Sequence, residues 1–293
     1  MSGDVAALLA WARARLRGRR EARLEAEVLL AHALGRPRSW LWAHPEAVPG
    51  EGARTRFEHL VARRAAGEPV AHLTGRREFW SLELEVGAAT LIPRPETERL
   101  VELALALLPE ASSARVADLG TGCGAVAVAL AVERRGIEVV ATDLSAAALA
   151  VAARNAARHA PGRIELRQGD WWQAVAGRRF HLAVANPPYI AADDPCLRRG
   201  DLPWEPQIAL TPGGDGLGAI RAIAAGAAAH LHPGGWLLLE HGADQGPAVR
   251  AILAAAGLVE VTTARDLAGH ERVSGGRVPG ASAAVHPRPD PAA

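Results

Sequence analysis

The stretch VADLGTGCGAVAVAL, residues 116–130, decides the fold of this 293-residue chain. It passes from a short apolar run through three alternating glycines into an Ala- and Val-rich segment typical of a helix. Gly120, Gly122 and Gly124 allow a tight backbone turn and let a ligand approach without meeting a Cβ atom. The pattern predicts a strand, a ligand-binding loop and a helix, in that order.

Two nucleotide chemistries use such a loop. A dinucleotide-binding fold requires GxGxxG/A, which Gly120, Gly122 and Ala125 satisfy. Methyltransferases that use S-adenosylmethionine prefer an acidic residue before GxGxG, and Asp118 occupies that position. A glycine-rich turn that binds no ligand is the third interpretation. The loop alone does not decide among the three.

Strand-like and helix-like runs alternate around the loop. This alternation predicts a parallel sheet with helices on both faces, a doubly wound α/β domain. Such sheets bind ligands at the carboxyl ends of their strands, near the switch in strand order. The predicted strands are 115–119, 138–143, 163–167, 180–185, 236–240 and 258–262, and the clearest helices are 145–159 and 217–230.

The chain before the glycine loop has a different character. Apolar residues follow helical spacing in the segments 5–16, 24–34 and 57–64. The run FWSLELEVGAATLIPRP, residues 79–95, alternates around Gly87 and predicts a β-hairpin linker. The expected organisation is therefore a helical N-terminal domain at 1–78, the linker at 79–95, the α/β domain at 96–278 and a loose Pro- and Ala-rich tail at 279–293.

Polar and aromatic residues follow the next two predicted strands. Asp143 ends the second strand, where a carboxylate can accept hydrogen bonds from both hydroxyls of a ribose. Alternatively it caps the next helix, a role that Ser145 can fill instead. After the third strand, Asp170 can meet the amine of an adenine. Trp171 or Trp172 can stack on the ring, or both can simply pack in the core.

The stretch VANPPYIA, residues 184–191, follows the fourth predicted strand and contains Tyr189, the only tyrosine of the chain. Because proline has no N–H, this segment presents carbonyls and few backbone donors. The side-chain oxygen of Asn186 and the carbonyl of Pro187 can therefore accept the two hydrogens of a planar –NH2 group, with Tyr189 against its flat face. Such acceptors enrich the nitrogen in electrons and stabilise the positive charge that develops when it attacks a sulfonium methyl.

The alternative to this clamp is a proline-rich turn with an incidental asparagine. The glycine loop, Asp143 and the tryptophan pair lie at the same predicted edge of the sheet, and their presence argues against that alternative.

With these residues identified, the chain resembles the release factor glutamine methyltransferases, the PrmC/HemK family, over nearly its whole length. NPPY is shared with adenine-N6 methyltransferases of DNA, but GEPVAHLTG and LIPRPETE in order before the glycine loop narrow the choice. In WEPQIAL (204–210), Trp204 replaces the Phe or Tyr usual before the family's EP. The matching segments are GEPVAHLTGRREFWSL (67–82), LIPRPETERLVE (91–102), DLGTGCGA (118–125), GDWW (169–172), NPPY (186–189), GGDGL (213–217) and LLLEHG (237–242).

The resemblance implies a Rossmann-like, seven-stranded class I methyltransferase domain at 96–278, preceded by a helical domain that grips the substrate protein. The implied reaction moves a methyl group from S-adenosylmethionine to the side-chain amide nitrogen (N5) of the glutamine in the GGQ motif of class I peptide chain release factors, leaving S-adenosylhomocysteine.

The resemblance also assigns roles to residues of this sequence. Asp143 would hold the ribose and Trp171 would contact adenine. Asn186, Pro187 and Tyr189 would be catalytic, and Asn186 would also lie beside the cofactor. The methionine part of the cofactor would rest on Gly120, Thr121, Gly122, Cys123 and Gly124, and the glutamine would be clamped by Asn186, Pro187, Pro188 and Tyr189.

Three other functions compete with this one. A nucleic-acid methyltransferase acting on adenine N6 or cytosine N4 is the nearest, because these amines share the –NH2 geometry of the amide. The formal net charge of +1 argues against it, since proteins that bind nucleic acid usually carry a strong basic excess. A dinucleotide oxidoreductase gives no reason for NPPY. A non-catalytic scaffold is disfavoured because the loop and the clamp are both intact.

Composition sets the remaining expectations. Cys123 and Cys196 form no CxxC pair and the histidines show no ligand spacing, so no metal site is expected. Arginines interrupt the apolar residues of the N-terminus, which argues against a signal peptide, and no apolar run is long enough to cross a membrane. We expect a cytoplasmic monomer that binds release factors, without membrane attachment or stable nucleic-acid binding.

Overall fold

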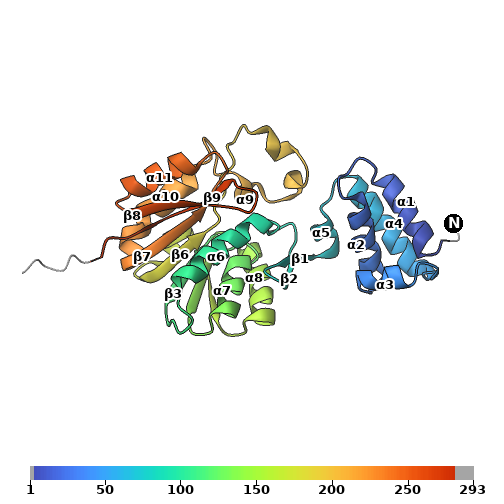
Figure 1. Ribbon diagram of the computed structural model, residues 1–293, viewed down its shortest axis with the longest axis horizontal. Coiled ribbons are helices and arrows are strands. Elements are labelled where there is room, and N and C mark those ends of the chain that lie inside the picture. The colour runs from blue at the N-terminus through green and yellow to red at the C-terminus, as the bar shows by residue number, and fades with distance from the viewer. Residues whose placement is uncertain (1–2, 281–293) are drawn as a thin grey trace, which may run out of the picture.

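Helices α1 to α4 form a separate N-terminal lobe in the computed structural model, which describes residues 3–280 (Figure 1). As predicted, α4 buries Phe57, Leu60, Val61 and Arg64 on one face. The apolar spacing in 24–34 predicts that Leu24 is buried, but Leu24 is exposed where α2 packs against α1 and α4 with its other faces. The four helices are Val5–Arg15, Ala22–Leu34, Arg38–Ala43 and Glu51–Ala65.

The hairpin between the lobes lies earlier than the sequence predicted. After α5 (Val70–Thr74), strands β1 (Arg76–Phe79) and β2 (Leu82–Glu85) pair antiparallel, and residues 86–94 form no strand. The turn is made by Trp80 and Ser81, which both have positive φ, 54° and 57°. Two-residue hairpin turns need this conformation, which Asn-Gly or Asp-Gly normally supplies, so Trp-Ser did not indicate a turn here.

The C-terminal lobe contains the predicted seven-stranded sheet, with strand order β5-β4-β3-β6-β7-β9-β8. The first five strands in this order are parallel, and β9 runs antiparallel to both of its neighbours. Six strands lie where they were predicted, with shifts at some ends, whereas β9 was not predicted. The strands are β3 Arg115–Leu119, β4 Glu138–Asp143, β5 Ile164–Gln168, β6 Phe180–Ala185, β7 Leu231–Glu240, β8 Val259–Arg265 and β9 Glu271–Arg277.

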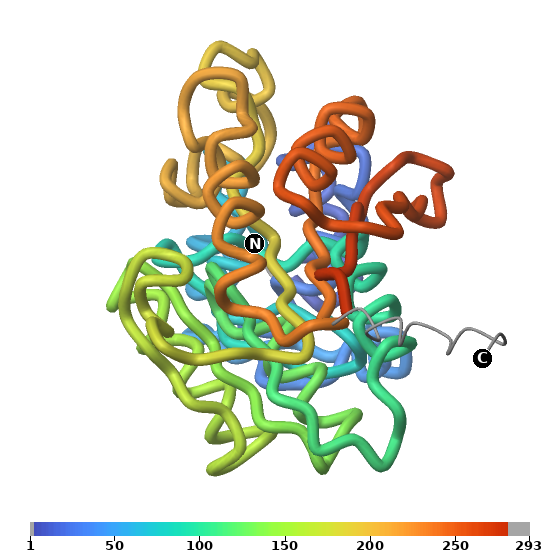
Figure 2. The backbone as a smooth tube through the Cα atoms, turned by 90° about the vertical axis from the view of Figure 1, so that its left-hand side faces the viewer, coloured from blue at the N-terminus to red at the C-terminus, as the bar shows by residue number. Residues whose placement is uncertain are grey.

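Helices cover both faces of this sheet, as a doubly wound domain requires (Figures 1 and 2). One face packs against α6 (Glu98–Leu107), α7 (Ala125–Glu133) and α8 (Ala146–His159). The other packs against α10 (Gly218–His230) and α11 (Gly246–Ala255). The remaining helical pieces are short: α9 Gln207–Leu210 and the 3₁₀ turns Pro95–Thr97, Trp171–Val175, Pro195–Arg198 and Leu202–Trp204.

Strand β3 is the switch point of the sheet. The chain proceeds outward from β3 to β4 and β5, and then returns to place β6 on the other side of β3. Leu119 at the end of β3 is paired with Thr142 of β4 and with Ala185 of β6. The loops that leave these three strands therefore meet at one edge, where α/β sheets bind their ligands.

The two lobes also touch through the segment between β6 and α10, which reaches toward the helical lobe (Figure 1). The buried guanidinium of Arg64 pairs with Glu25 in its own lobe at 2.6 Å and with Asp201 of that segment at 2.9 Å. The ring of Trp204 lies against Gly67. Within residues 3–280, no helix combines the length and the apolar character needed to span a membrane. The predicted tail at 279–293 falls almost wholly outside the described residues.

Candidate active site

A cavity of about 450 Å³ opens at the carboxyl ends of β3, β4 and β6. This volume lies within the range of about 300–1,000 Å³ that small-molecule sites occupy. Most of the predicted site residues lie in its wall. Those that line it are Gly120, Thr121, Gly122, Cys123, Asp143, Trp171, Asn186 and Pro188, whereas Gly124, Pro187 and Tyr189 do not.

The glycine loop takes the strand–loop–helix form that its sequence predicts. All three glycines have positive φ: 76° at Gly120, 58° at Gly122 and 86° at Gly124. A Cβ atom on Gly120 would lie 3.0 Å from the Trp171 ring, so this glycine leaves the space that the indole occupies. A Cβ on Gly124 would lie 3.2 Å from that of Ala152, so this third glycine serves helix packing and not the cavity.

Asp118 lies under this loop and organises it. Its carboxyl accepts hydrogen bonds from the Thr121 hydroxyl at 2.6 Å and from the Ala127 N–H at 3.2 Å. Complete burial raises the pKa of Asp118 to about 6, although both hydrogen bonds act in the opposite direction. The acidic residue before GxGxG therefore ties the loop to the start of α7.

Asp143 connects the glycine loop to the end of β4. One carboxylate oxygen accepts from the Gly122 N–H at 2.9 Å and the other from the Ser145 N–H at 2.8 Å. Ser145 caps α8 through the Ala148 N–H, so the helix needs no cap from Asp143. A carboxylate has about four acceptor positions, which leaves two of them for ligand hydroxyls.

The two tryptophans after β5 have different surroundings. Trp172 is buried, donates from Nε1 to the Ile223 carbonyl at 2.7 Å and stacks on His230. Trp171 lines the cavity and holds a left-handed backbone with φ 37°, which is uncommon for a bulky residue. Strained backbone of this kind concentrates at ligand sites. Trp171 is therefore available to a ligand ring, and Trp172 belongs to the core.

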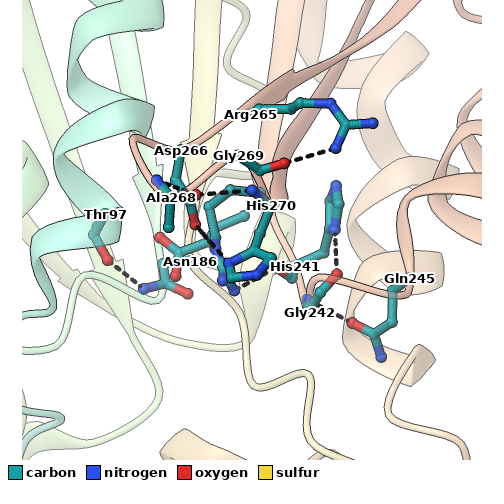
Figure 3. Close-up of polar contacts among 12 residues, drawn as sticks. Thr97, Asn186, His241, Gly242, Gln245, Arg265, Asp266, Ala268, Gly269 and His270 are labelled. Atoms are coloured by element: carbon teal, nitrogen blue, oxygen red, sulfur yellow. Dashed lines mark hydrogen bonds and ion pairs between the residues drawn. The ribbon is translucent and has the colours of Figure 1, made fainter.

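The NPPY segment presents only part of itself to the cavity. Asn186 and Pro188 line the wall, and the Asn186 side-chain N–H donates to the Thr97 hydroxyl at 3.2 Å (Figure 3). Pro187 is buried behind them. Tyr189 points its hydroxyl at Glu240, 3.3 Å away, and its ring packs against the core.

Glu240 is a second buried carboxyl of the site and was not predicted. It is 1% exposed at the end of β7. Burial raises its pKa to about 7, while the hydroxyls of Thr97 and Tyr189 and the charge of Arg272 oppose this shift. Its second oxygen, Oε2, is buried without a hydrogen-bond partner in residues 3–280. The acidic residue at the end of the apolar run LLLEHG (237–242) was the signal that could have revealed it.

Residues assigned to the linker form another part of the wall. Ala89, Thr90, Leu91 and Pro93 all line the cavity. They are held there by Glu205, whose buried carboxylate accepts from the Ile92 N–H at 3.0 Å and pairs with Arg94. Contacts between residues more than 100 positions apart are invisible to local patterns. The segments LIPRPE and EP both belong to the family resemblance, and this was the available signal that they act together.

The lining suits a nucleoside that carries a charged sulfonium. Asp143 offers acceptors for ribose hydroxyls, Trp171 offers an apolar ring face, and the glycines leave room for a chain beside the backbone. Asp170 adds a second carboxylate to the wall. In the described part of the chain no group of three or more His, Cys, Asp or Glu side chains is placed to hold a metal ion.

Two family models match the chain, one for each lobe. Residues 7–75 match the PrmC N-terminal domain, and residues 99–197 match the methyltransferase small domain. A solved methyltransferase from Pyrococcus furiosus aligns with 75% of this chain and 98% of its own, with a TM-score of 0.53 and 18% sequence identity. At that identity the similarity shows the fold.

Curated relatives match over most of their length. The release factor glutamine methyltransferase of Xylella fastidiosa (strain Temecula1) is 57% identical over 258 residues, which cover 88% of this chain and 94% of the relative. The enzyme of the same name from Pseudomonas aeruginosa is 53% identical, with 87% and 92% covered. With this identity over both lobes, the chain belongs to the release factor glutamine methyltransferase family.

Proposed function

We propose that this protein transfers a methyl group from S-adenosylmethionine to the side-chain amide nitrogen (N5) of the glutamine in the GGQ motif of class I peptide chain release factors. The observation that carries the proposal is that the glycine loop, Asp143 and Asn186 line one cavity at the switch point of the sheet. The name shared by relatives that match both lobes supports the substrate class.

On the side of the cavity proposed for the cofactor, three groups of residues have separate proposed roles. S-Adenosylmethionine would supply a methyl group that its positively charged sulfur already makes electrophilic. Asp143 would accept hydrogen bonds from the ribose hydroxyls through its remaining acceptor positions, and Trp171 would cover one face of the base. Gly120, Thr121, Gly122 and Cys123 would hold the methionine part, and Gly124 would support the loop from behind by its packing against Ala152.

The substrate side acts on the glutamine amide. Oδ1 of Asn186 and the Pro187 carbonyl would accept the two amide hydrogens and turn the nitrogen toward the methyl group. As the nitrogen–carbon bond forms and the carbon–sulfur bond breaks, positive charge develops on the nitrogen, and these acceptors stabilise it until a proton leaves. Alignment of the reacting atoms can contribute about 7–11 kcal/mol to the acceleration.

Tyr189 keeps its proposed place beside the amide, although its hydroxyl faces Glu240 and not the cavity. This role rests on the resemblance of the NPPY segment alone, because the Tyr189 ring packs against the core and does not line the cavity.

The helical lobe, α1 to α4, would bind the release factor at a distance from the reacting glutamine. Its match to the PrmC N-terminal domain supports this role. The proposed substrate belongs to translation, which places the proposed activity in the cytoplasm. We propose that the protein acts as a monomer.

The test is methylation of a purified, unmodified class I release factor in the presence of S-adenosylmethionine, followed by mass spectrometry of the GGQ peptide. We expect the glutamine to gain one methyl group. A release factor whose GGQ glutamine is replaced by alanine should gain none and serves as the control. Methylated adenine or cytosine in added nucleic acid, with an unmodified GGQ peptide, would contradict the substrate and favour the nucleic-acid methyltransferase.

A further inference from the structure

The side-chain amide of Asn186 can face the cavity in two ways, because its oxygen and nitrogen are similar in shape. Only one of them suits the proposed reaction, since an acceptor must face the glutamine –NH2 group. In the structure Nδ2 donates to the Thr97 hydroxyl at 3.2 Å, which turns Oδ1 away from Thr97 (Figure 3). In the opposite orientation, Thr97 would donate to Oδ1, and the acceptor would be turned away from the substrate.

Thr97 can fix this orientation because its buried hydroxyl does not cap α6 and contacts the Asn186 amide instead. It is 4% exposed and occupies the N-cap position of α6. Threonine at this position normally accepts a hydrogen bond from the first turn of the helix. Here no side-chain cap bond forms. The hydroxyl instead accepts from the Asn186 side-chain N–H, and it is near enough to the Glu240 carboxyl to oppose the rise in the pKa of that group.

Glu240 determines which way the Thr97 hydroxyl points its proton. Oε1 of Glu240 accepts from the Tyr189 hydroxyl, and Oε2 is buried without a formed hydrogen bond within residues 3–280. Above about pH 7, where Glu240 is ionised, its unbonded buried oxygen is costly, so the neighbouring Thr97 hydroxyl points its proton toward it. A hydroxyl that donates to Glu240 has only lone pairs left for Asn186, and the amide must then present its N–H to Thr97.

We propose that Thr97 and Glu240 are positioning residues, which fix the Asn186 amide with Oδ1 toward the substrate and anchor Tyr189 through its hydroxyl. This inference rests on the proposed function, because it assigns a task to Oδ1. Three elements that are distant in sequence are joined in this way: the start of α6, the end of β6 and the end of β7.

The test compares Thr97→Val, which keeps the shape and removes the hydroxyl, with Thr97→Ser, which keeps the hydroxyl. We expect Thr97→Val to lower kcat for release factor methylation by about 10-fold, the equivalent of one net hydrogen bond. Binding of S-adenosylhomocysteine should not change. Thr97→Ser should restore most of the rate. A Thr97→Ser variant as slow as Thr97→Val would overturn the proposal, because the hydroxyl would then not matter.

A double-mutant cycle separates positioning from general structural damage. In an Asn186→Ala background there is no amide left to orient, so Thr97→Val should cause little further loss of kcat. A loss as large as in the wild-type background would show that Thr97 acts independently of Asn186 and would overturn the inference.

Failure of the proposed function can be recognised separately. If the wild-type protein methylates no release factor, the proposed function fails. The network is then tested without activity, by the ¹⁵N NMR signals of the Asn186 side-chain amide. These signals should shift in Thr97→Val and stay near the wild-type positions in Thr97→Ser. Unshifted signals in Thr97→Val would overturn the network.

Discussion

The ends of β3 and β6 lie side by side, and a buried carboxyl lies next to each of them. The two carboxyls, Asp118 and Glu240, differ in the hydrogen bonds that they accept. Under the glycine loop, Asp118 is bonded by Thr121 and Ala127, which are three and nine residues away. Beside NPPY, Glu240 accepts one long hydrogen bond, from Tyr189, 51 residues away, and within residues 3–280 its Oε2 has no formed hydrogen bond. The side proposed for the cofactor is built by local contacts, and the side proposed for the substrate depends on contacts between distant segments.

The largest expected effect separates the two sides by function. Replacing Asn186 with Ala should lower kcat by about 10²–10³, as does removal of one group that stabilises a transition state, while the affinity for S-adenosylmethionine stays nearly intact. Single-turnover rates and calorimetric titration measure the two quantities. An equal loss of affinity and rate would assign Asn186 to the cofactor side and contradict the proposed division between the two sides of the cavity.

The second effect distinguishes the two carboxyls by pH. The folded-state pKa of Glu240 is raised from 4.5 to about 7, so the native state holds its proton more tightly than the unfolded chain. The free energy of unfolding should therefore fall as pH rises through this window, by up to about 3 kcal/mol. Glu240→Gln should remove this fall, which urea unfolding at several pH values can measure.

Asp118→Asn is the matched control for this titration. The pKa of Asp118 is raised from 3.8 to about 6, so its contribution is lost at lower pH than that of Glu240. Above about pH 6 the slope of stability against pH should respond mainly to Glu240→Gln. An equal response to both variants there would mean that the two carboxyls are equivalent.

The smallest of these effects concerns the cofactor side. Asp143→Ala should weaken binding of S-adenosylhomocysteine by about 10- to 100-fold, the loss expected for hydrogen bonds to a charged group. At saturating S-adenosylmethionine, kcat should change much less. Asp143→Asn keeps acceptors for Gly122 or Ser145 and should fall between wild type and alanine. A loss of kcat with unchanged affinity would contradict the ribose role.

The local character of the proposed cofactor side explains why several residues singled out from the sequence lie together in the cavity wall. The loop, Asp143 and the two tryptophans follow predicted strands directly, and the strands β3, β4 and β6 were predicted with their observed ends. The assignment of Trp171 to the cavity and Trp172 to the core needed the structure, because both residues are large and adjacent.

The missed features all depend on distant contacts. In the sequence, Thr97 has the pattern of an ordinary helix start and Glu240 is the last residue of an apolar strand. Neither pattern indicates that the two side chains lie in one proposed network with Asn186. Strand β9 contains Gly275 and Gly276, which normally indicate a turn. Here a Cβ on Gly275 would collide with Leu238 of the neighbouring strand, so close strand approach requires the glycine. Residue propensities for β-structure cannot predict such a strand, because contact with the neighbouring strand is what requires glycine here.

Asn155 carries a consequence for where the catalytic unit begins. This fully buried side chain bonds both backbone groups of Glu85 in the β1–β2 hairpin, and also the Cys123 carbonyl of the glycine loop. Together with the cavity wall at 89–93, these bonds make the hairpin part of the catalytic lobe and not a tether to it. A gene fragment for this lobe should thus start at Arg76, since one starting at Glu96 would remove a wall of the cavity and two of the three partners of Asn155.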